Sequence, residues 1–145
     1  MLTNSSKYAL RAVIYLGVNQ KEGLSFGIKK ISEDLNVPTP FLSKILQVLA
    51  RQKILVSAKG PNGGFSLPES SYIVKIRRIV EIMEGNDIFD QCLLGSGMCT
   101  NQEHSENCPM HSGFSPIREA FIEMFEKETI KSITEKIKDG KNIRL

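Results

Sequence analysis

Three cysteines and a histidine lie close together in the second half of the chain. Cys92, Cys99 and Cys108 fall within 17 residues, and His111 follows the last of them after a Pro-Met pair. Thiolates bind soft or borderline metals, and an imidazole nitrogen can complete a four-ligand set. The close Cys-x2–4-Cys pairs of zinc sites are absent, whereas wide spacing on a flexible, glycine-rich segment suits an iron–sulfur cluster. The residues predict such a site, with three incidental loop thiols as the alternative.

The other chemical groups of this segment carry weaker signals. His104 lies between Glu103 and Glu106 and is typical of a surface histidine. Cys108 and His111 could be a nucleophile and its base, but their spacing in a polar loop supplies no oxyanion site. Motifs for a nucleophilic serine, a phosphate-binding loop or a dinucleotide fold are missing. We therefore expect neither an enzyme nor a small-molecule substrate.

Length, composition and cysteine usage indicate the class of protein and its compartment. The 145 residues are 41% hydrophobic and 24% charged, as in a globular domain. An odd number of cysteines cannot pair completely in disulfides, and the first 20 residues show no secretory signal. We expect a cytoplasmic protein, in a reducing compartment where clustered cysteines usually serve metal or redox chemistry. The apolar runs are too short to span a membrane.

The charge is unevenly distributed along the chain. Residues 1–68 contain nine Lys/Arg and three Asp/Glu, whereas residues 69–145 contain ten Lys/Arg and thirteen Asp/Glu. The net charge of +3 therefore combines a basic first part with an acidic second part. This asymmetry predicts that the first part meets a polyanion.

Apolar periodicity predicts three helices in the basic part. The first covers residues 6–18 and is capped by Asn4, Ser5 or Ser6; the second covers residues 27–36 with Ser25 as N-cap. Pro38 ends the second helix, and Thr39 caps a third that has Pro40 in its first turn. The buried side of this third segment is predicted to comprise Phe41, Leu42, Ile45, Leu46, Val48, Leu49 and Ile54. Two helices with a tight connection form a helix-turn-helix pattern.

A short hairpin is predicted after the third helix. Residues 54–57 and 65–67 read as strands, and residues 59–64, Lys-Gly-Pro-Asn-Gly-Gly, form a dense turn signal. A basic, glycine-rich hairpin in this position is typical of the wing of a winged helix. Lys59 and the backbone amides at its tip suit a phosphate track or a narrow minor groove.

The helix-turn-helix and wing predict an interface with double-stranded DNA. The third helix presents Thr39, Ser43, Lys44 and Gln47, which suit the major groove. The full predicted DNA-binding set is Ser5, Lys7, Thr39, Ser43, Lys44, Gln47, Arg51, Lys59, Gly60 and Pro61. The alternative is a three-helix core used for protein contacts, with lysines that are merely solvated.

Beyond the wing, the pattern predicts helices on either side of a long irregular segment. A helix over residues 73–84 buries Ile73, Ile76, Ile79, Val80 and Met83, and residues 86–113 form a loop containing all cysteines and histidines. Ser115 and Pro116 start a further helix with the apolar stripe Ile117, Phe121, Met124 and Phe125, which forms either monomer core or a homodimer seam. Thr129 caps a last short helix that ends at Gly140.

These elements define the expected organisation of the chain. The fold class is mainly α with a small β-hairpin wing: a winged helix-turn-helix domain plus a long C-terminal dimerisation helix. Residues 1–85 form the DNA-binding domain, residues 86–113 the cluster-binding loop, and residues 114–145 the dimerisation helix and last short helix.

The chain resembles the Rrf-two family of bacterial transcriptional regulators, of the IscR and NsrR type. The resemblance extends from Lys7-Tyr8-Ala9-Leu10 to residues 130–137, and its most specific parts are the wing, residues 59–67, and the three-cysteine loop. It implies a homodimeric winged-helix regulator that binds a partly palindromic operator. It further implies an iron–sulfur cluster, the 2Fe–2S type favoured over 4Fe–4S, that modulates DNA binding according to iron–sulfur status, nitric oxide or redox state.

The resemblance also implies roles for individual residues. Cys92, Cys99 and Cys108 match the three thiolate ligands, and His111 matches the fourth ligand of IscR-like members. Some relatives take the fourth ligand from an acidic residue near the partner's N-terminus, but residues 5–8 contain no carboxylate. Lys59 replaces a frequent arginine and Ser43 replaces a glutamate found in IscR-like members, so base preference is not transferred.

Two other functions remain open at this point. A metal-free or zinc-bound repressor with oxidant-sensing thiols would explain the same cysteines. An iron–sulfur carrier protein would explain the loop, but it would leave the basic helix and the wing without a role.

Overall fold

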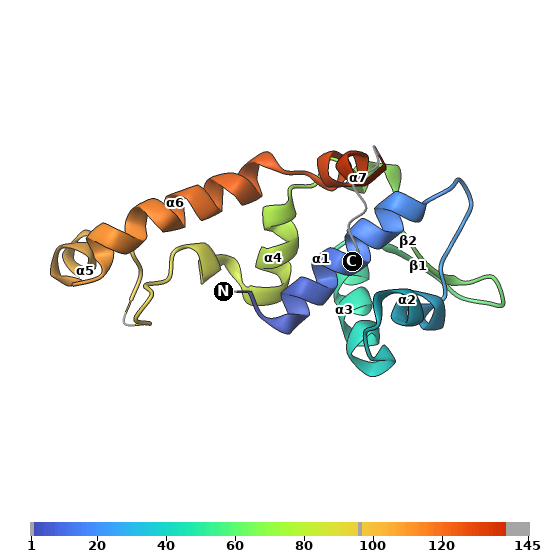
Figure 1. Ribbon diagram of the computed structural model, residues 1–145. Coiled ribbons are helices and arrows are strands. Elements are labelled where there is room, and N and C mark those ends of the chain that lie inside the picture. Colours follow the sequence, from blue (N-terminus) through green and yellow to red (C-terminus); the bar gives the residue numbers. More distant parts are fainter. Residues whose placement is uncertain (1, 96, 139–145) are drawn as a thin grey trace.

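Helix α1 (Asn4–Asn19) lies at the centre of the molecule (Figure 1). Its buried side is formed by apolar residues three or four positions apart, Ala9, Ala12, Val13 and Leu16. The computed structural model describes residues 2–95 and 97–138. Thr3, in an extended conformation, is the N-cap and accepts a hydrogen bond from the Ser6 amide at 3.4 Å. The predicted helix is confirmed, but its cap is neither Asn4, Ser5 nor Ser6.

Helices α2 (Ile28–Leu35) and α3 (Thr39–Arg51) form the predicted helix-turn-helix. Asn36 adopts the left-handed conformation that ends α2, with φ of 51°, and the Val37 amide donates to the Ser32 carbonyl at 3.0 Å. Pro38 then sets the extended backbone from which α3 starts. The turn therefore satisfies its polar groups while reversing the chain within three residues.

The predicted caps of these two helices are wrong. Gly27 and Pro38 occupy the N-cap positions of α2 and α3, without side-chain cap bonds. Ser25 lies too far upstream to cap α2. Thr39 belongs to α3 itself, and its hydroxyl makes a hydrogen bond to that of Ser32 at 2.9 Å, which links the two helices.

One predicted core residue of α3 is exposed. Leu42, Ile45, Leu46 and Leu49 are buried as expected, and Ile54 is buried after the helix. Phe41, however, is 63% exposed, because it lies on a different side of α3 from its fully buried neighbour Leu42. The prediction that Phe41 is buried is therefore wrong, and Val48 is only half-buried.

The wing consists of strands β1 (Val56–Ala58) and β2 (Gly64–Ser66), paired antiparallel with Ser57 opposite Phe65. The strands lie one or two residues from their predicted positions, because Ile54 and Leu55 turn into the core. Phe26 and Phe65 exchange backbone hydrogen bonds of 2.9 Å. Gly64, with φ of 146°, allows this approach, since a Cβ there would lie 2.3 Å from the Phe26 carbonyl oxygen.

Helix α4 (Ile76–Glu84) starts three residues later than predicted, after a short 3-10 turn at Glu69–Ser71. The intervening segment is a turn, in which the Val74 amide donates to the Ser71 carbonyl at 3.0 Å. Its backbone also pairs with the start of the last helix, since the Ile130 amide donates to the Val74 carbonyl at 3.0 Å. Ile73 is consequently 77% exposed, and its predicted place on the buried face is wrong.

The predicted loop over residues 86–113 is partly helical. It contains a 3-10 turn at Asn86–Phe89, helix α5 (Gln102–Asn107) and the start of helix α6 (His111–Lys127). The predicted start of α6 at Ser115-Pro116 is wrong, since Pro116 lies inside the helix. Pro116 cannot donate to the Ser112 carbonyl, but Ser112 is exposed and water can satisfy that oxygen.

Helix α7 (Ile130–Lys138) returns to the body and packs on α1. Thr129 caps it as predicted, because the Ser132 amide donates to the Thr129 hydroxyl at 3.1 Å. Gly17 of α1 allows close packing, since a Cβ there would lie 2.6 Å from the Thr134 methyl group. The predicted end at Gly140 lies outside the described residues.

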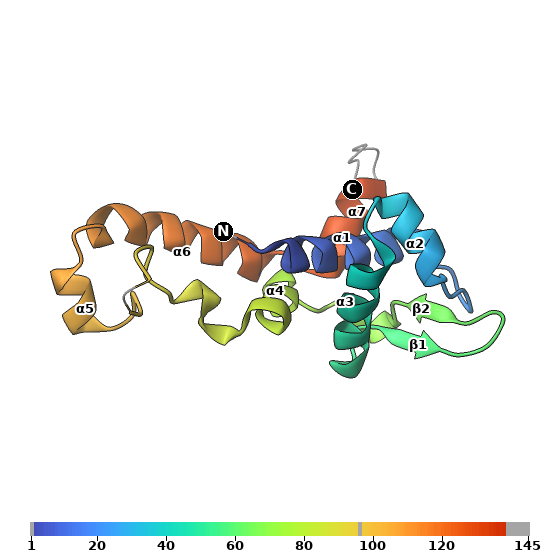
Figure 2. The same cartoon turned by 90° about the horizontal axis from the view of Figure 1, so that it is seen from below.

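The described elements form a helical body with an extended arm. Helices α1, α2, α3, α4 and α7 form the body, whereas α6 runs away from it and carries α5 at its far end (Figure 1). The hairpin and α3 lie beside each other on the side of the body away from α5 (Figure 2). The architecture is mainly α with one hairpin, as predicted.

Candidate nucleic-acid interface and metal centre

Polar side chains of α3 form the first part of the predicted DNA-binding surface. Lys44, Gln47 and Arg51 are exposed, and Thr39 and Ser43 are half-buried. The Gln47 amide donates to the Ser43 hydroxyl at 3.3 Å, so these two side chains lie together on the helix. The helix therefore presents hydrogen-bonding groups and cations of the kind that read or position DNA.

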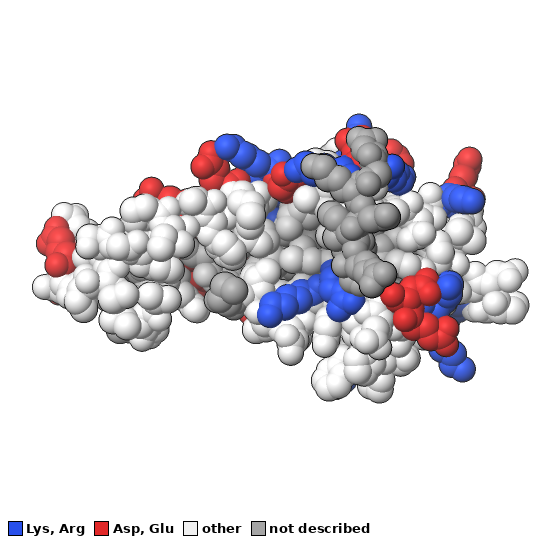
Figure 3. All heavy atoms as spheres, viewed as in Figure 1, with Lys and Arg blue, Asp and Glu red and all other residues white. Residues whose placement is uncertain are grey.

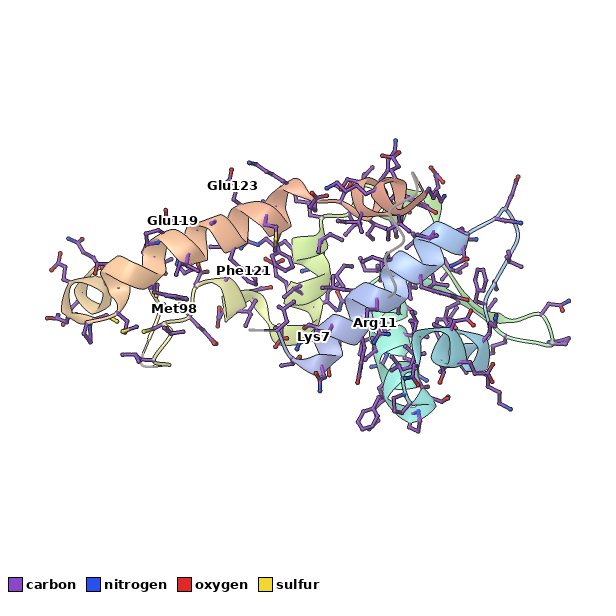
Figure 4. All side chains as sticks on the ribbon, viewed as in Figure 1. Lys7, Arg11, Met98, Glu119, Phe121 and Glu123 are labelled. Atoms are coloured by element: carbon purple, nitrogen blue, oxygen red, sulfur yellow. The ribbon has the colours of Figure 1, made fainter. Side chains whose placement is uncertain are left out.

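The start of α1 and the tip of the wing supply the other predicted residues. Ser5 and Lys7 are exposed in the first two turns of α1. Figure 4 places Lys7 near the helix start, one turn before Arg11, whose guanidinium donates to the Leu35 carbonyl at the end of α2. At the wing, Lys59, Gly60 and Pro61 are exposed. The predicted set thus comes from three elements.

The surface charge follows the division seen in the sequence. On the face shown in Figure 3, basic side chains lie over the body together with acidic ones, and the far end of the arm shows acidic ones. A polyanion would therefore be repelled at the arm tip.

The cysteine thiols lie together on the arm, beside the start of α6. Cys92 Sγ and Cys108 Sγ are 3.8 Å apart although 16 residues separate them in the sequence. Cys92 and Cys99 are buried and Cys108 is half-buried. Burial raises the pKa of the Cys99 thiol, the neighbouring Cys92 and Cys108 thiols raise it further, and Arg118 opposes these effects. The structure therefore brings all three predicted ligands into one neighbourhood.

Backbone hydrogen bonds hold the cysteine-bearing turn. The Cys99 amide donates to the Asp90 carbonyl at 2.7 Å, and the Cys92 amide donates to the Gly97 carbonyl at 2.8 Å. The Leu94 amide points at Cys92 Sγ at 3.4 Å. The Leu94 amide thus offers a hydrogen bond to the sulfur of one predicted ligand.

The predicted histidine ligand lies one turn from the thiols. The His111 amide donates to the Cys108 carbonyl at 3.1 Å, and its Nδ1 atom is buried without a hydrogen-bond partner among the described residues. His104 lies in α5, and its side chain is outside the described part of the structure. Among the described residues, no three His, Cys, Asp or Glu side chains are arranged to hold a single metal ion.

Arg118 joins the cysteine segment, residues 86–101, to α6. Its guanidinium donates to the Phe89 carbonyl at 3.0 Å and approaches the Asp90 carboxylate at 3.4 Å. Because the Asp90 carbonyl binds the Cys99 amide, one arginine links α6 to the backbone that holds a thiol. Arg118 was not among the residues predicted from the sequence, although it is the only Lys or Arg between residues 79 and 126 and lies within an apolar stripe.

An aromatic cluster connects the same segment to the body. Phe89 packs against Phe121 and Phe125 of α6, with ring centroids 5.9 and 5.6 Å apart. The Arg77 guanidinium of α4 lies 4.9 Å from the Phe89 ring and also pairs with Glu126 of α6 at 2.6 Å. The cysteine segment, α4 and α6 thus share one packed junction.

The predicted dimerisation stripe divides into buried and exposed members. Phe125 is buried and Phe121 half-buried, whereas Ile117 and Met124 are 66% and 52% exposed. Figure 4 shows Phe121 on the side of α6 that faces the cysteine segment and Glu119 and Glu123 on the opposite side. The stripe therefore serves the core of the monomer in part and leaves apolar surface in part.

Within the described ranges, no helix is both long and apolar enough to cross a membrane.

Comparison with known proteins gives consistent matches over nearly the whole chain. The family model Rrf2, described as an iron-dependent transcriptional regulator, matches residues 2–136. The HTH-type transcriptional regulator NsrR of Oceanobacillus iheyensis is 24% identical over 91% of this chain and 88% of its own. Among solved structures, B. subtilis CymR, the global cysteine regulator, gives a TM-score of 0.74 at 18% identity, covering 94% of this chain and 97% of its own. IscR of T. potens gives 0.71 at 18% identity, covering 100% and 93%.

The helix-turn-helix, its hairpin and the long α6 define a winged-helix protein, as the sequence predicted. The class is that of transcriptional regulators that bind DNA. The chain belongs to the Rrf2 family. The resemblance drawn from the wing and the cysteine loop is thereby confirmed.

Proposed function

We propose that the protein binds a partly palindromic operator as a homodimer and that an iron–sulfur cluster on its cysteine segment modulates this binding. In this proposal, residues 1–85 contact DNA, residues 86–113 hold the cluster, and the helix in residues 114–145 forms the dimer. The proposed compartment is the reducing cytosol, where thiols persist. The observation that carries the proposal is the convergence of Cys92, Cys99 and Cys108.

The donor set fits an iron–sulfur cluster, preferentially of the 2Fe–2S type. Cys92, Cys99 and Cys108 supply three thiolates. The Nδ1 atom of His111, which has no hydrogen-bond partner among the described residues, supplies a nitrogen as the fourth donor. Cluster ligands are distributed over several iron atoms, so they need not converge on a single ion. When bound, such a cluster supplies a group sensitive to redox state, to nitric oxide and to iron–sulfur supply.

The residues around the thiols provide a route from the site to the DNA-binding surface. A change in the Cys99 backbone acts on Asp90 and, through Arg118, on α6. Phe89 and Arg77 connect the same segment to α4 of the body. In a dimer joined along α6, a shift of this junction changes the spacing of the two α3 helices and therefore their fit to two half-sites.

The cluster is tested on protein purified without oxygen, by iron and sulfide analysis and visible absorbance. We expect iron, acid-labile sulfide and visible absorbance, all lost in the triple variant C92A/C99A/C108A. His111→Ala should weaken cluster retention, and Asn107→Ala is the matched control on the exposed end of α5. Protein that remains colourless and iron-free after reconstitution would contradict cluster binding.

DNA binding is measured with the same protein on genomic promoter fragments. We expect specific retention that differs between cluster-loaded and cluster-free protein. Wild type and the triple-cysteine variant binding equally under every condition would remove the cluster as the switch. Absence of any specific retention would refute the DNA-binding proposal itself.

A thiol-based sensor is the second candidate, because Cys92 and Cys108 are already 3.8 Å apart. A peroxide-class oxidant would take two electrons and two protons from this pair, forming one S–S bond and releasing reduced oxidant. The expected signs are DNA binding by metal-free or zinc-bound protein and a Cys92–Cys108 disulfide found by mass spectrometry after peroxide treatment. Reversal by a dithiol would complete the case.

A further inference from the structure

Phe41 is an exposed aromatic residue on the surface assigned to DNA. It is the third residue of α3 and is 63% exposed, whereas Leu42, next in the chain, is fully buried. Phe41 also lines a hollow of about 380 Å³ between α1, α3 and α4, together with Ser5, Tyr8, Lys44, Val48 and Met83.

The position of Phe41 separates it from the proposed dimer seam. The exposed apolar residues of α6 lie on the arm, and α3 projects from the body on the other side of α1 (Figure 1). The hollow beside it is lined mainly by apolar residues such as Tyr8, Val48 and Met83, and Lys44 in the same lining is exposed. An apolar surface beside an exposed cation suits a polyanion that also carries apolar groups.

Thymine in the major groove has that chemistry. The N-terminal residues of a recognition helix approach base edges, and the C5 methyl group of thymine is the one apolar feature there. The hydroxyl groups of Thr39 and Ser43 already make hydrogen bonds with Ser32 and Gln47, so they are not fully available for bonds to bases. An aromatic ring in the first turn supplies a contact that none of the hydrogen-bonding residues can make.

We propose that Phe41 is a specificity-determining residue that packs against a thymine methyl group in each half-site of the operator. This inference rests on the proposed DNA binding and assigns part of its sequence preference. Phe41 selects thymine over cytosine or uracil at one position, whereas Lys44 and Lys59 bind phosphates regardless of sequence.

The test removes one methyl group from the DNA. A preferred duplex is first selected from a random library with wild-type protein, and each thymine is then replaced singly by deoxyuridine. We expect one position per half-site at which the replacement weakens wild-type binding about fourfold, the equivalent of ~0.8 kcal/mol for one buried methyl group. Phe41→Ala should bind the thymine and uracil duplexes equally, and Phe41→Leu should keep part of the preference. Low salt keeps the weakened variants measurable.

Ile73→Ala is the matched control, because Ile73 is 77% exposed but lies outside α3. It should keep the wild-type ratio, and all three variants should melt near the wild-type temperature because these side chains are exposed. A Phe41→Ala variant with an unchanged thymine-to-uracil ratio would overturn the inference while leaving DNA binding intact. A Phe41→Ala variant that loses affinity for every sequence alike would also overturn the inference, because such a loss indicates that Phe41 packs against the DNA backbone and not against a base. Failure of wild type to select any duplex would overturn the proposed function and this inference together.

Discussion

Lys44 and Lys59 are exposed cations on two elements of the same surface. A lysine that neutralises a phosphate releases counterions, so its contribution appears in the salt dependence of binding. Each change to alanine should reduce the slope of log affinity against log salt concentration. The expected reduction is about one unit for each phosphate contact that is lost in a half-site. Lys127→Ala, on the arm and 71% exposed, should leave the slope unchanged. A slope that stays constant would remove that lysine from the interface.

Glu84 ties the start of α1 to the end of α4. Its carboxylate accepts hydrogen bonds from the Thr3 amide at 2.8 Å, the Thr3 hydroxyl at 2.7 Å and the Ser6 hydroxyl at 2.5 Å. Burial opposes ionisation, but these bonds outweigh it and hold the pKa of Glu84 below its ordinary value. Glu84→Gln should lower the free energy of unfolding by about 1 kcal/mol at neutral pH.

The pH dependence of this effect has a defined sign. A carboxyl group with a lowered pKa in the folded state stabilises the protein above its unfolded pKa of about 4.5. That contribution is lost as the pH falls through the lower folded pKa. Chemical unfolding at a series of pH values should show the wild-type advantage over Glu84→Gln shrinking below about pH 4.5. A constant difference down to pH 3 would contradict this account.

At the scale of elements, Arg118 connects α6 to the cysteine segment. Arg118→Ala removes the donor to the Phe89 carbonyl and should cost about 1–3 kcal/mol of stability. Hydrogen exchange measured by mass spectrometry should show faster exchange across residues 86–101, with the core of α1 unchanged. Glu119→Ala, which changes the neighbouring residue on the opposite side of α6, is the control (Figure 4). Equal exchange in both variants would show that Arg118 does not hold the segment.

The wing depends on a glycine at one position. A Cβ at Gly64 would meet the Phe26 carbonyl oxygen at 2.3 Å, and the residue has φ of 146°. Gly64→Ala should destabilise the hairpin by about 1–3 kcal/mol and weaken DNA binding through the displaced wing tip. Gly27→Ala, where a Cβ meets no atom within 4 Å, should behave as wild type in melting and binding assays.

Periodic elements were predictable, and their boundaries were not. The helix-turn-helix and wing follow from apolar spacing, proline and glycine signals, which are local. The late start of α4 depends on backbone pairing of Val74 with Ile130, a contact between distant residues. Likewise, Pro116 is a valid start signal, but α6 begins earlier because an exposed carbonyl tolerates the missing donor. Local patterns carry no information on such tertiary exceptions.

The candidate sites show the same division. The cysteines were identified by residue type and spacing alone, whereas the anchoring role of Arg118 requires knowing which backbone it reaches. Phe41 was assigned to the core because it is apolar and lies near the helical stripe. Because Phe41 is exposed and Leu42 is buried, the edge of the buried face of α3 falls between these two neighbours, and apolar spacing alone does not locate that edge.

For the whole molecule, the arm is where two copies are proposed to meet. Ile117 and Met124 are 66% and 52% exposed on α6. Burying a glutamate in an apolar seam is costly, so Ile117→Glu or Met124→Glu should convert dimer to monomer in sedimentation velocity experiments. Monomers should bind a full operator much more weakly, because two half-sites are no longer engaged together. Ile73→Glu, at a residue that is 77% exposed but lies on the body, should remain dimeric.

The close packing of Gly17 against Thr134 joins the beginning of the chain to its end. During synthesis, α1 therefore leaves the ribosome long before the helix that covers one of its sides. The DNA-binding body cannot complete its core until the cysteine segment and the arm have been made. A nascent or truncated chain that stops before Ile130 consequently has α3 but not its finished body. The body is thus complete only after the cysteine segment and the arm are also present.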